Sequence, residues 1–217
     1  MWPIAIFAFS DFPSFSFVEI IEGLQKNPTG AFFSENITKI MNPDFYIDSR
    51  TVNLREILTR MGKSKNPFTV IQNDKTSFSQ FSMRQVLEIG ALCKTGFDTT
   101  SFAQKHIVSF KRDETIRDII EKLKKEQNEF VMLEDEFSFV NYDIILEKLK
   151  ELGNTQNENL LNLSASTLRT ITPMLISDKL NISEICRIML NAGHPCVMTS
   201  DRLITPYDVL DVLCKEG

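Results

Sequence analysis

Apolar and polar residues follow one recurring order of short elements along the chain. In the last copy, Met174-Leu175-Ile176-Ser177 is a short apolar run with the length of a strand. Ile182, Ile185 and Met189 follow at the spacing of one helix face. Two more apolar runs lead into a second amphipathic helix that begins near Thr205. The pattern predicts the order strand, helix, strand, strand, helix.

Two anchors show that this unit is repeated. The first is a helix start that occurs three times: Asn53-Leu54-Arg55-Glu56-Ile57, Thr115-Ile116-Arg117-Asp118-Ile119 and Asn181-Ile182-Ser183-Glu184-Ile185. The second is a strand-to-helix junction that occurs four times, around positions 19, 85, 143 and 208, at steps of 66, 58 and 65 residues. Such a period is longer than that of the common helical solenoids. We therefore expect small α+β domains in tandem.

The predicted domains cover residues 1–30, 31–93, 102–152 and 160–217, and we call them repeats 1 to 4. Repeat 1 holds only the second half of the unit, beginning with an apolar segment that we interpret as a buried strand. This segment is too short for a membrane span and lacks the basic start of a signal peptide. The polar stretches 94–101 and 153–159 are rich in turn formers and are interpreted as linkers.

Composition excludes some functions. The chain has 217 residues, 42% of them apolar, and a net charge of -5, so it can build a sizeable core and is not disordered throughout. An acidic chain without a dense basic tract is a poor partner for nucleic acid or an anionic membrane. Its four cysteines form no CxxC pair and its two histidines have no ligand spacing, which predicts reduced thiols, no metal site and a cytoplasmic location.

The repeat resembles a known family. Gly193-His194-Pro195-Cys196-Val197, followed by Leu203-Ile204-Thr205-Pro206-Tyr207-Asp208, looks like the strand-turn-strand and Thr/Ser-x-x-Asp signature of tandem CBS-domain proteins. The resemblance implies an α+β fold in which each repeat has a three-stranded sheet and two helices. It also implies that repeats pair through their sheets into Bateman modules.

In that family the clefts between paired repeats commonly bind AMP, ADP, ATP or S-adenosylmethionine. Carried onto this sequence, the resemblance assigns Asp208 to the ribose hydroxyls and Thr205 to phosphate. Ile171 and Met174 would flank the base, and His194, Arg202 and Arg169 are candidate counter-charges. A carboxylate can accept two hydrogen bonds from a ribose diol, and a helix N-terminus favours phosphate.

The four copies depart from the signature unequally. Repeat 3 keeps Asp143 but has Val140 where a hydroxyl is expected. Repeat 2 has Ser82 with Gln85, and repeat 1 has Ser16 with Glu19. We therefore expect the better ligand site in the C-terminal half, formed by repeats 3 and 4.

Other interpretations stay open at this point. Thr205-Pro206-Tyr207-Asp208 is also a good helix start without any ligand, and the Ser-x-x-Gln and Ser-x-x-Glu copies fit a capping box. The leading hypothesis is a ligand-sensing regulatory protein that needs no cofactor, signals to a protein partner and forms a homodimer. The runner-up is an assembly scaffold with degenerate sites. A nucleotide hydrolase ranks last, because the sequence contains no phosphate-binding loop or nucleophile elbow.

Overall fold

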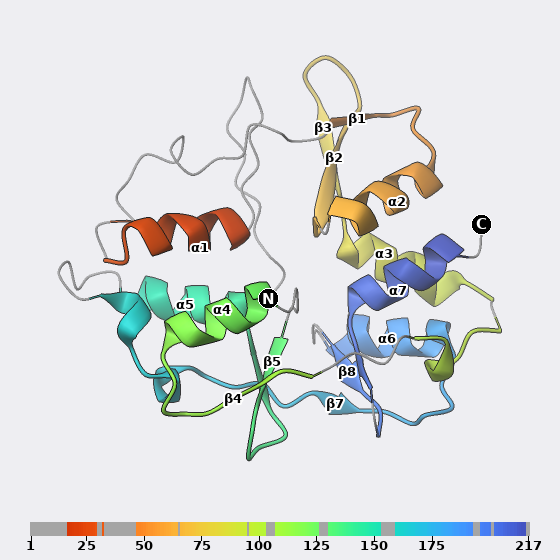
Figure 1. Cartoon of the computed structure of the whole chain (residues 1–217). Helices are drawn as coiled ribbons and strands as arrows, with labels where there is room; N and C mark the ends of the chain where they lie inside the picture. Colours follow the sequence, from red (N-terminus) through yellow and green to blue (C-terminus); the bar gives the residue numbers. More distant parts are fainter. Residues whose placement is uncertain are drawn as a thin grey trace. The chain divides into compact units, whose positions relative to one another are not determined.

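The computed structural model describes most of repeats 2, 3 and 4 and one helix of repeat 1 (Figure 1). The described residues are 17–29, 32, 47–64, 66–94, 96–102, 107–125, 130–152, 159–192, 196–200 and 202–215. The predicted strand near the N-terminus, Ser16, Gly193 and His194 lie outside them. Repeat 1 is represented by α1 (Phe17–Lys26), which begins directly after the junction that the sequence marks.

The three longer repeats have the predicted order of elements. Repeat 2 consists of β1 (Ile47–Ser49), α2 (Leu54–Ser64), β2 (Phe68–Gln72), β3 (Phe78–Ser82) and α3 (Met83–Leu92). Repeat 3 consists of β4 (Ser109–Phe110), α4 (Ile116–Lys125), β5 (Phe130–Leu133), β6 (Phe139–Asn141) and α5 (Tyr142–Leu152). Repeat 4 consists of β7 (Met174–Leu175), α6 (Ile182–Ala192), β8 (Val197–Met198), β9 (Leu203–Ile204) and α7 (Pro206–Lys215).

Each repeat forms its own three-stranded sheet with one topology. The first strand pairs parallel to the second, and the second pairs antiparallel to the third. A parallel pair needs a crossover connection, which the first helix of each repeat supplies. The α+β fold class predicted from the sequence is therefore confirmed, and so are the three predicted helix starts.

The chain divides into two compact units that each combine repeats from both halves of the sequence. The first unit comprises Met1–Phe45 and His106–Thr172, and the second comprises Tyr46–Lys105 and Pro173–Gly217. Repeats 1 and 3 thus share a unit, as do repeats 2 and 4. The expected pairing of repeats 3 and 4 through their sheets concerns residues of both units and stays a prediction.

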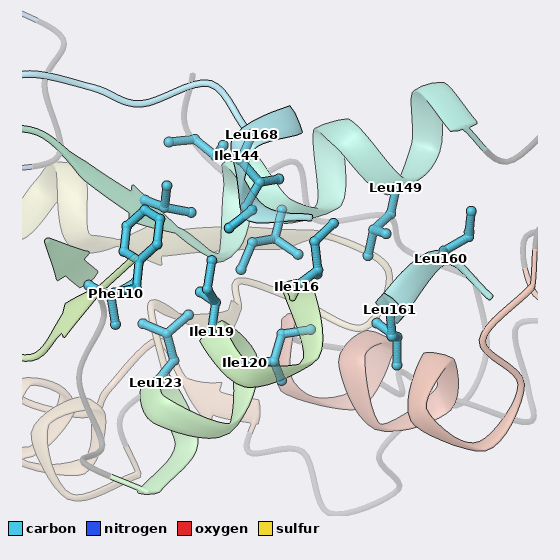
Figure 2. Close-up of a cluster of buried hydrophobic side chains, with 14 of the residues drawn as sticks. Phe110, Ile116, Ile119, Ile120, Leu123, Ile144, Leu149, Leu160, Leu161 and Leu168 are labelled. Atoms are coloured by element: carbon cyan, nitrogen blue, oxygen red, sulfur yellow. The ribbon is translucent and has the colours of Figure 1, made fainter. Parts of the chain in front are cut away.

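The core of the first unit is a single apolar cluster (Figure 2). Helix α4 is strongly amphipathic and turns one face inward, with Ile116, Ile119, Ile120 and Leu123 fully or almost fully buried. Repeat 1 contributes to the same cluster through the buried Leu24 of α1. The cluster explains why residues far apart in sequence belong to one unit.

The second unit is held together by helices of two repeats. Helix α3 of repeat 2 packs against α6 and α7 of repeat 4, and α2 packs against α7. Gly90 permits the close approach of α3 and α6, because a Cβ placed there would lie 2.5 Å from the Sγ of Cys186. The Ser183 hydroxyl also donates a hydrogen bond to the Ala91 carbonyl at 2.7 Å. The described contact between repeats 2 and 4 therefore runs through helices.

The stretch predicted as the first linker packs against repeat 4 over its described part. We call residues 97–102 the first strap. It contains the short helix η3 (Thr99–Ser101), whose first turn is capped by the Asp98 side chain. The amide of Ile182 donates to the Phe97 carbonyl at 3.1 Å, and the amide of Thr99 donates to the Leu180 carbonyl at 3.2 Å. The first strap thus covers the start of α6.

A second strap, residues 163–168, docks on repeat 3 in the same way. It contains the short helix η5 (Ala165–Thr167), capped by the Ser164 side chain, and follows η4 (Leu160–Asn162). The amide of Ile116 donates to the Leu163 carbonyl at 2.9 Å, and the amide of Ala165 donates to the Glu114 carbonyl at 2.7 Å. Each strap therefore precedes one repeat in sequence and docks on the other.

Candidate functional site at the start of helix α7

The predicted site lies where β9 ends and α7 begins. The backbone amide and the hydroxyl of Thr205 both donate to Oδ2 of Asp208, each at 2.8 Å. Thr205 is 1% exposed and Asp208 is 5% exposed. The two residues assigned to phosphate and ribose are thus brought together, and they are nearly closed off from solvent.

The local sequence explains this turn. Threonine is a favoured N-cap, proline is favoured at the first helical position, and an acidic third residue can reach back to the cap amide. Helix α7 then buries Val209, Leu210 and Val212, which fixes its N-terminus against the rest of the second unit. A carboxylate offers about four lone-pair sites. The cap bonds to Oδ2 are therefore compatible with further hydrogen bonds from a diol.

The same hydrogen bonds occur at the start of α4, outside the signature. The amide and the hydroxyl of Thr115 donate to Oδ2 of Asp118 at 2.8 Å and 2.7 Å. These bonds, led by the one from the Thr115 hydroxyl, hold the pKa of Asp118 below its usual value. The hydrogen-bond pattern is thus that of a helix cap, and it does not by itself indicate a ligand.

The equivalent junctions of the other repeats differ from that of repeat 4. In repeat 2, Ser82 caps α3 and its amide donates to Oε1 of Gln85 at 2.9 Å, which is the predicted capping box. In repeat 3, the cap is Asn141, whose Oδ1 accepts from the amide of Ile144 at 3.0 Å. Among repeats 2, 3 and 4, repeat 4 is therefore the one with a carboxylate at the third helical position of this junction, and in repeat 1 the third residue of α1 is Glu19.

The structure changes the expected equivalence of Asp143 and Asp208. Val140 pairs with Val131 in the sheet just as Ile204 pairs with Val197, so Asn141 stands where Thr205 stands. Asp143 consequently lies one residue before the position of Asp208. Burial raises the pKa of Asp143, and the hydrogen bond from the Asn141 side chain offsets part of this rise. Asp143 therefore belongs to a different place on its helix.

Arg202 has contacts that the sequence did not predict. Its Nη1 donates to the carbonyl oxygens of Thr99 at 2.9 Å and Phe102 at 3.2 Å, both in the first strap. Carbonyl groups need a donor when they are buried, and arginine offers five. Arg202 therefore ties the first strap to repeat 4, and its assigned role as a counter-charge for phosphate stays a prediction.

The remaining predicted site residues lie in different places. Met174 is in the edge strand β7 and is exposed. Ile171 belongs to the first unit, where it exchanges two backbone hydrogen bonds of 2.9 Å with Phe139. His194 lies outside the described residues. The structure thus brings together Thr205 and Asp208, and it leaves the contacts assigned to Met174 and Ile171 untested.

The docking of the straps was missed by sequence reasoning. Asp98 accepts from the amide of Thr100 at 2.9 Å, and Ser164 accepts from the amide of Ser166 at 3.2 Å. An Asp or Ser two residues before a second hydroxyl residue is a usual sign of a capped turn. That sign marks a turn in each strap, but it does not say which repeat the turn will contact.

The described residues contain no cluster of three or more His, Cys, Asp or Glu side chains placed to hold a metal ion. All four cysteines are free thiols in this structure. Burial raises the pKa of Cys186 to about 12, so this thiol stays protonated. Among the helices that the structure describes, none has the length and apolar character to span a membrane.

Comparison with solved structures identifies the fold of this chain. A protein from Methanocaldococcus jannaschii, described as a candidate archaeal homologue of γ-AMPK, matches with a TM-score of 0.72 and 13% identity over 91% of this chain and 77% of the other. An uncharacterised conserved protein from Pyrococcus horikoshii matches with a TM-score of 0.58 and 12% identity over 81% of this chain and 82% of the other.

A CBS-domain protein from Pyrobaculum aerophilum, complexed with AMP, matches with a TM-score of 0.42 and 14% identity, over 56% of this chain and all of that one. The chain has the tandem CBS-domain fold. No protein-family model and no curated protein sequence matches it. Within the CBS fold, repeats 2 to 4 show the full order of elements, and the assignment of α1 as the second helix of a partial repeat 1 stays a prediction.

Proposed function

We propose that this CBS-domain protein is a regulatory module that binds an adenine nucleotide or a related adenosyl ligand at the start of α7. Thr205 would contact the phosphate and Asp208 the ribose. The observation that supports this proposal is the pairing of a hydroxyl with a carboxylate at the junction of repeat 4. The described junctions of repeats 2 and 3 have an amide and an aliphatic side chain at the position of Asp208.

The burial of the site suggests how binding would be coupled to a signal. Thr205 and Asp208 are almost inaccessible, so a ligand can reach them only after a local opening of the second unit. A ligand that binds the opened form better shifts the population toward it. A protein partner, or a second copy of this chain, would then read the change. In this proposal the protein senses its ligand and does not transform it.

Thermal unfolding of the whole chain with AMP, ADP, ATP or S-adenosylmethionine tests the proposal. A ligand at one hundred times its dissociation constant stabilises the native state by about 2.7 kcal/mol. We expect one of the four to raise the midpoint of the wild type and of Asp118→Ala, but not that of Asp208→Ala. Asp118→Ala is the matched control, because it removes the same type of helix cap. If no ligand moves the wild type, the proposed site is wrong.

A second function is favoured by the same burial. Thr205 and Asp208 bond to each other, and a buried pair that satisfies itself can be purely structural. In that case the chain would be an assembly scaffold that binds its partner without a ligand. Absorbance near 260 nm distinguishes the two functions. Excess absorbance of the purified protein at this wavelength would mean that it holds a nucleotide. No excess absorbance, together with no thermal shift by any ligand, would support the scaffold.

A further inference from the structure

The docking positions of the two straps have an exact counterpart in repeat 2. In repeat 3, the first helix begins at Ile116, seven residues after Ser109, which pairs with Met132. In repeat 4, the first helix begins at Ile182, seven residues after Leu175, which pairs with Met198. In repeat 2, the same spacing separates Ile47, which pairs with Val70, from the start of α2. We call Arg50, Val52 and Leu54 the repeat-2 groove. They occupy the positions of residues 112, 114 and 116, and of 178, 180 and 182.

The repeat-2 groove differs from its counterparts in exposure. Ile116 and Ile182 are 0% exposed, whereas Leu54 is 43% exposed. The amides of Ile116 and Ile182 each donate to a strap carbonyl. Among the residues that the structure describes, none accepts a hydrogen bond from the amide of Leu54. Repeat 2 thus presents an apolar side chain and a backbone donor at the place where the other two repeats are covered.

The two filled positions define the chemistry of an occupant. Each strap begins and ends with a large apolar residue, and its four inner residues are small or polar. The second residue is an acid or carries a hydroxyl, the third is small or carries a hydroxyl, and the fourth and fifth carry hydroxyls. The two segments are Phe97-Asp98-Thr99-Thr100-Ser101-Phe102 and Leu163-Ser164-Ala165-Ser166-Thr167-Leu168. The carbonyl of the first residue accepts from the helix, and the amide of the third donates to the groove.

We propose that the repeat-2 groove is a docking site for a strap-like segment of a partner polypeptide. The apolar first residue of that segment would cover Leu54, its carbonyl would accept from the Leu54 amide, and its third amide would donate to the Val52 carbonyl. Arg50 and Arg55 are exposed beside the groove, which favours an acidic second residue like Asp98 over a neutral one. Both straps described in this chain are already docked on repeats 3 and 4. This docking site in repeat 2 is separate from the nucleotide site that we propose in repeat 4.

Amide hydrogen exchange on the whole chain tests this inference at three equivalent positions. We expect the Leu54 amide to exchange at least ~10-fold faster than the amides of Ile116 and Ile182, since exchange is slow only where a hydrogen bond must first open. A synthetic peptide with the sequence of residues 96–102 should slow the Leu54 amide. A scrambled peptide should leave it unchanged.

Matched variants locate the peptide. Leu54→Glu should abolish binding of the fluorescein-labelled 96–102 peptide, measured by fluorescence anisotropy. Leu92→Glu changes another exposed apolar side chain, 81% exposed at the end of α3, and should leave binding intact. The inference is overturned if the Leu54 amide in the free chain is as protected as the other two, because the chain then covers its own groove. It is also overturned if the peptide does not bind, or binds Leu54→Glu as well as wild type.

Discussion

The Thr205–Asp208 turn at α7 and the Thr115–Asp118 turn at α4 have the same hydrogen bonds in different surroundings. In both, a threonine amide and hydroxyl donate to one carboxylate oxygen. Asp208 is buried, whereas Asp118 is partly exposed. The comparison shows that a four-residue signature describes a helix start, and that burial and position in the repeat must supply any argument for function.

The largest expected effect comes from disturbing only the unit that holds Thr205 and Asp208. Gly90→Ala places a Cβ 2.5 Å from Cys186 Sγ and 3.2 Å from Val209 Cγ1, so α3, α6 and α7 must shift. Overpacking of this kind lowers the free energy of unfolding by about 1–3 kcal/mol. Amide exchange should show lost protection in α6 and α7 and unchanged protection in α4.

Gly62→Ala is the control for that variant, because its new Cβ would be at least 3.8 Å from its neighbours. Replacing a glycine inside a helix by alanine raises the free energy of unfolding by about 0.5–1 kcal/mol. A Gly90→Ala protein as stable as wild type would contradict the close packing of α3 on α6.

Removing the buried carboxylate of Asp208 should have an effect of similar size, and removing the partly exposed carboxylate of Asp118 a smaller one. Asp208→Ala leaves the buried amide and hydroxyl of Thr205 without this acceptor, which costs about 2 kcal/mol. Asp118→Ala should cost less, since water can replace the lost acceptor at a partly exposed cap. Chemical denaturation measures both changes. Equal losses in the two variants would mean that burial does not distinguish the turns.

These two turns also show what the sequence could and could not predict. The order of elements and the three first-helix starts follow from apolar spacing and capping residues, which act locally, and they are confirmed. The one-residue offset of Asp143 was hidden, because Tyr142-Asp143 repeats the letters of Tyr207-Asp208 while the sheet register sets the helix start. Pairing Val131 with Val140 makes Asn141 the cap.

The straps were beyond sequence reasoning for a different reason. Their contacts join residues far apart in the chain, such as Arg202 with Thr99, and such contacts leave no periodic pattern. The first linker is interpreted from the sequence as a polar turn, which is correct for η3. The second strap with η5 lies in the range expected for repeat 4, outside the second predicted linker. The repeat that each turn contacts depends on how the repeats are combined into units, and a local pattern does not contain this information.

The smallest expected effect is the response of repeat 3 to pH. The hydrogen bonds from Thr115 lower the pKa of Asp118, so their stabilisation is present above the ordinary carboxyl pKa of about 3.9 and is lost as pH falls below it. Burial raises the pKa of Asp143, so its contribution is full below that ordinary value and is lost as pH rises through the raised one.

Substitution by asparagine separates these two contributions. Asp118→Asn should remove part of the loss of stability in acid, and Asp143→Asn should remove part of the loss on the way to neutral pH. Denaturation midpoints measured from pH 3 to pH 7 provide the check. If both substitutions changed the pH dependence of the denaturation midpoint in the same direction, the assigned causes of the pKa shifts would be contradicted.

The central claim is that Asp208 binds a ligand in addition to capping α7. Equilibrium dialysis of AMP and ATP against the wild type, Asp208→Asn and Asp118→Asn tests it most directly. Losing a charged acceptor for the ribose corresponds to about 10- to 100-fold weaker binding. We predict this loss for Asp208→Asn alone, with Asp118→Asn binding as the wild type does. Equal binding by all three proteins, or binding by none, would show that Thr205 and Asp208 form a helix cap and nothing more.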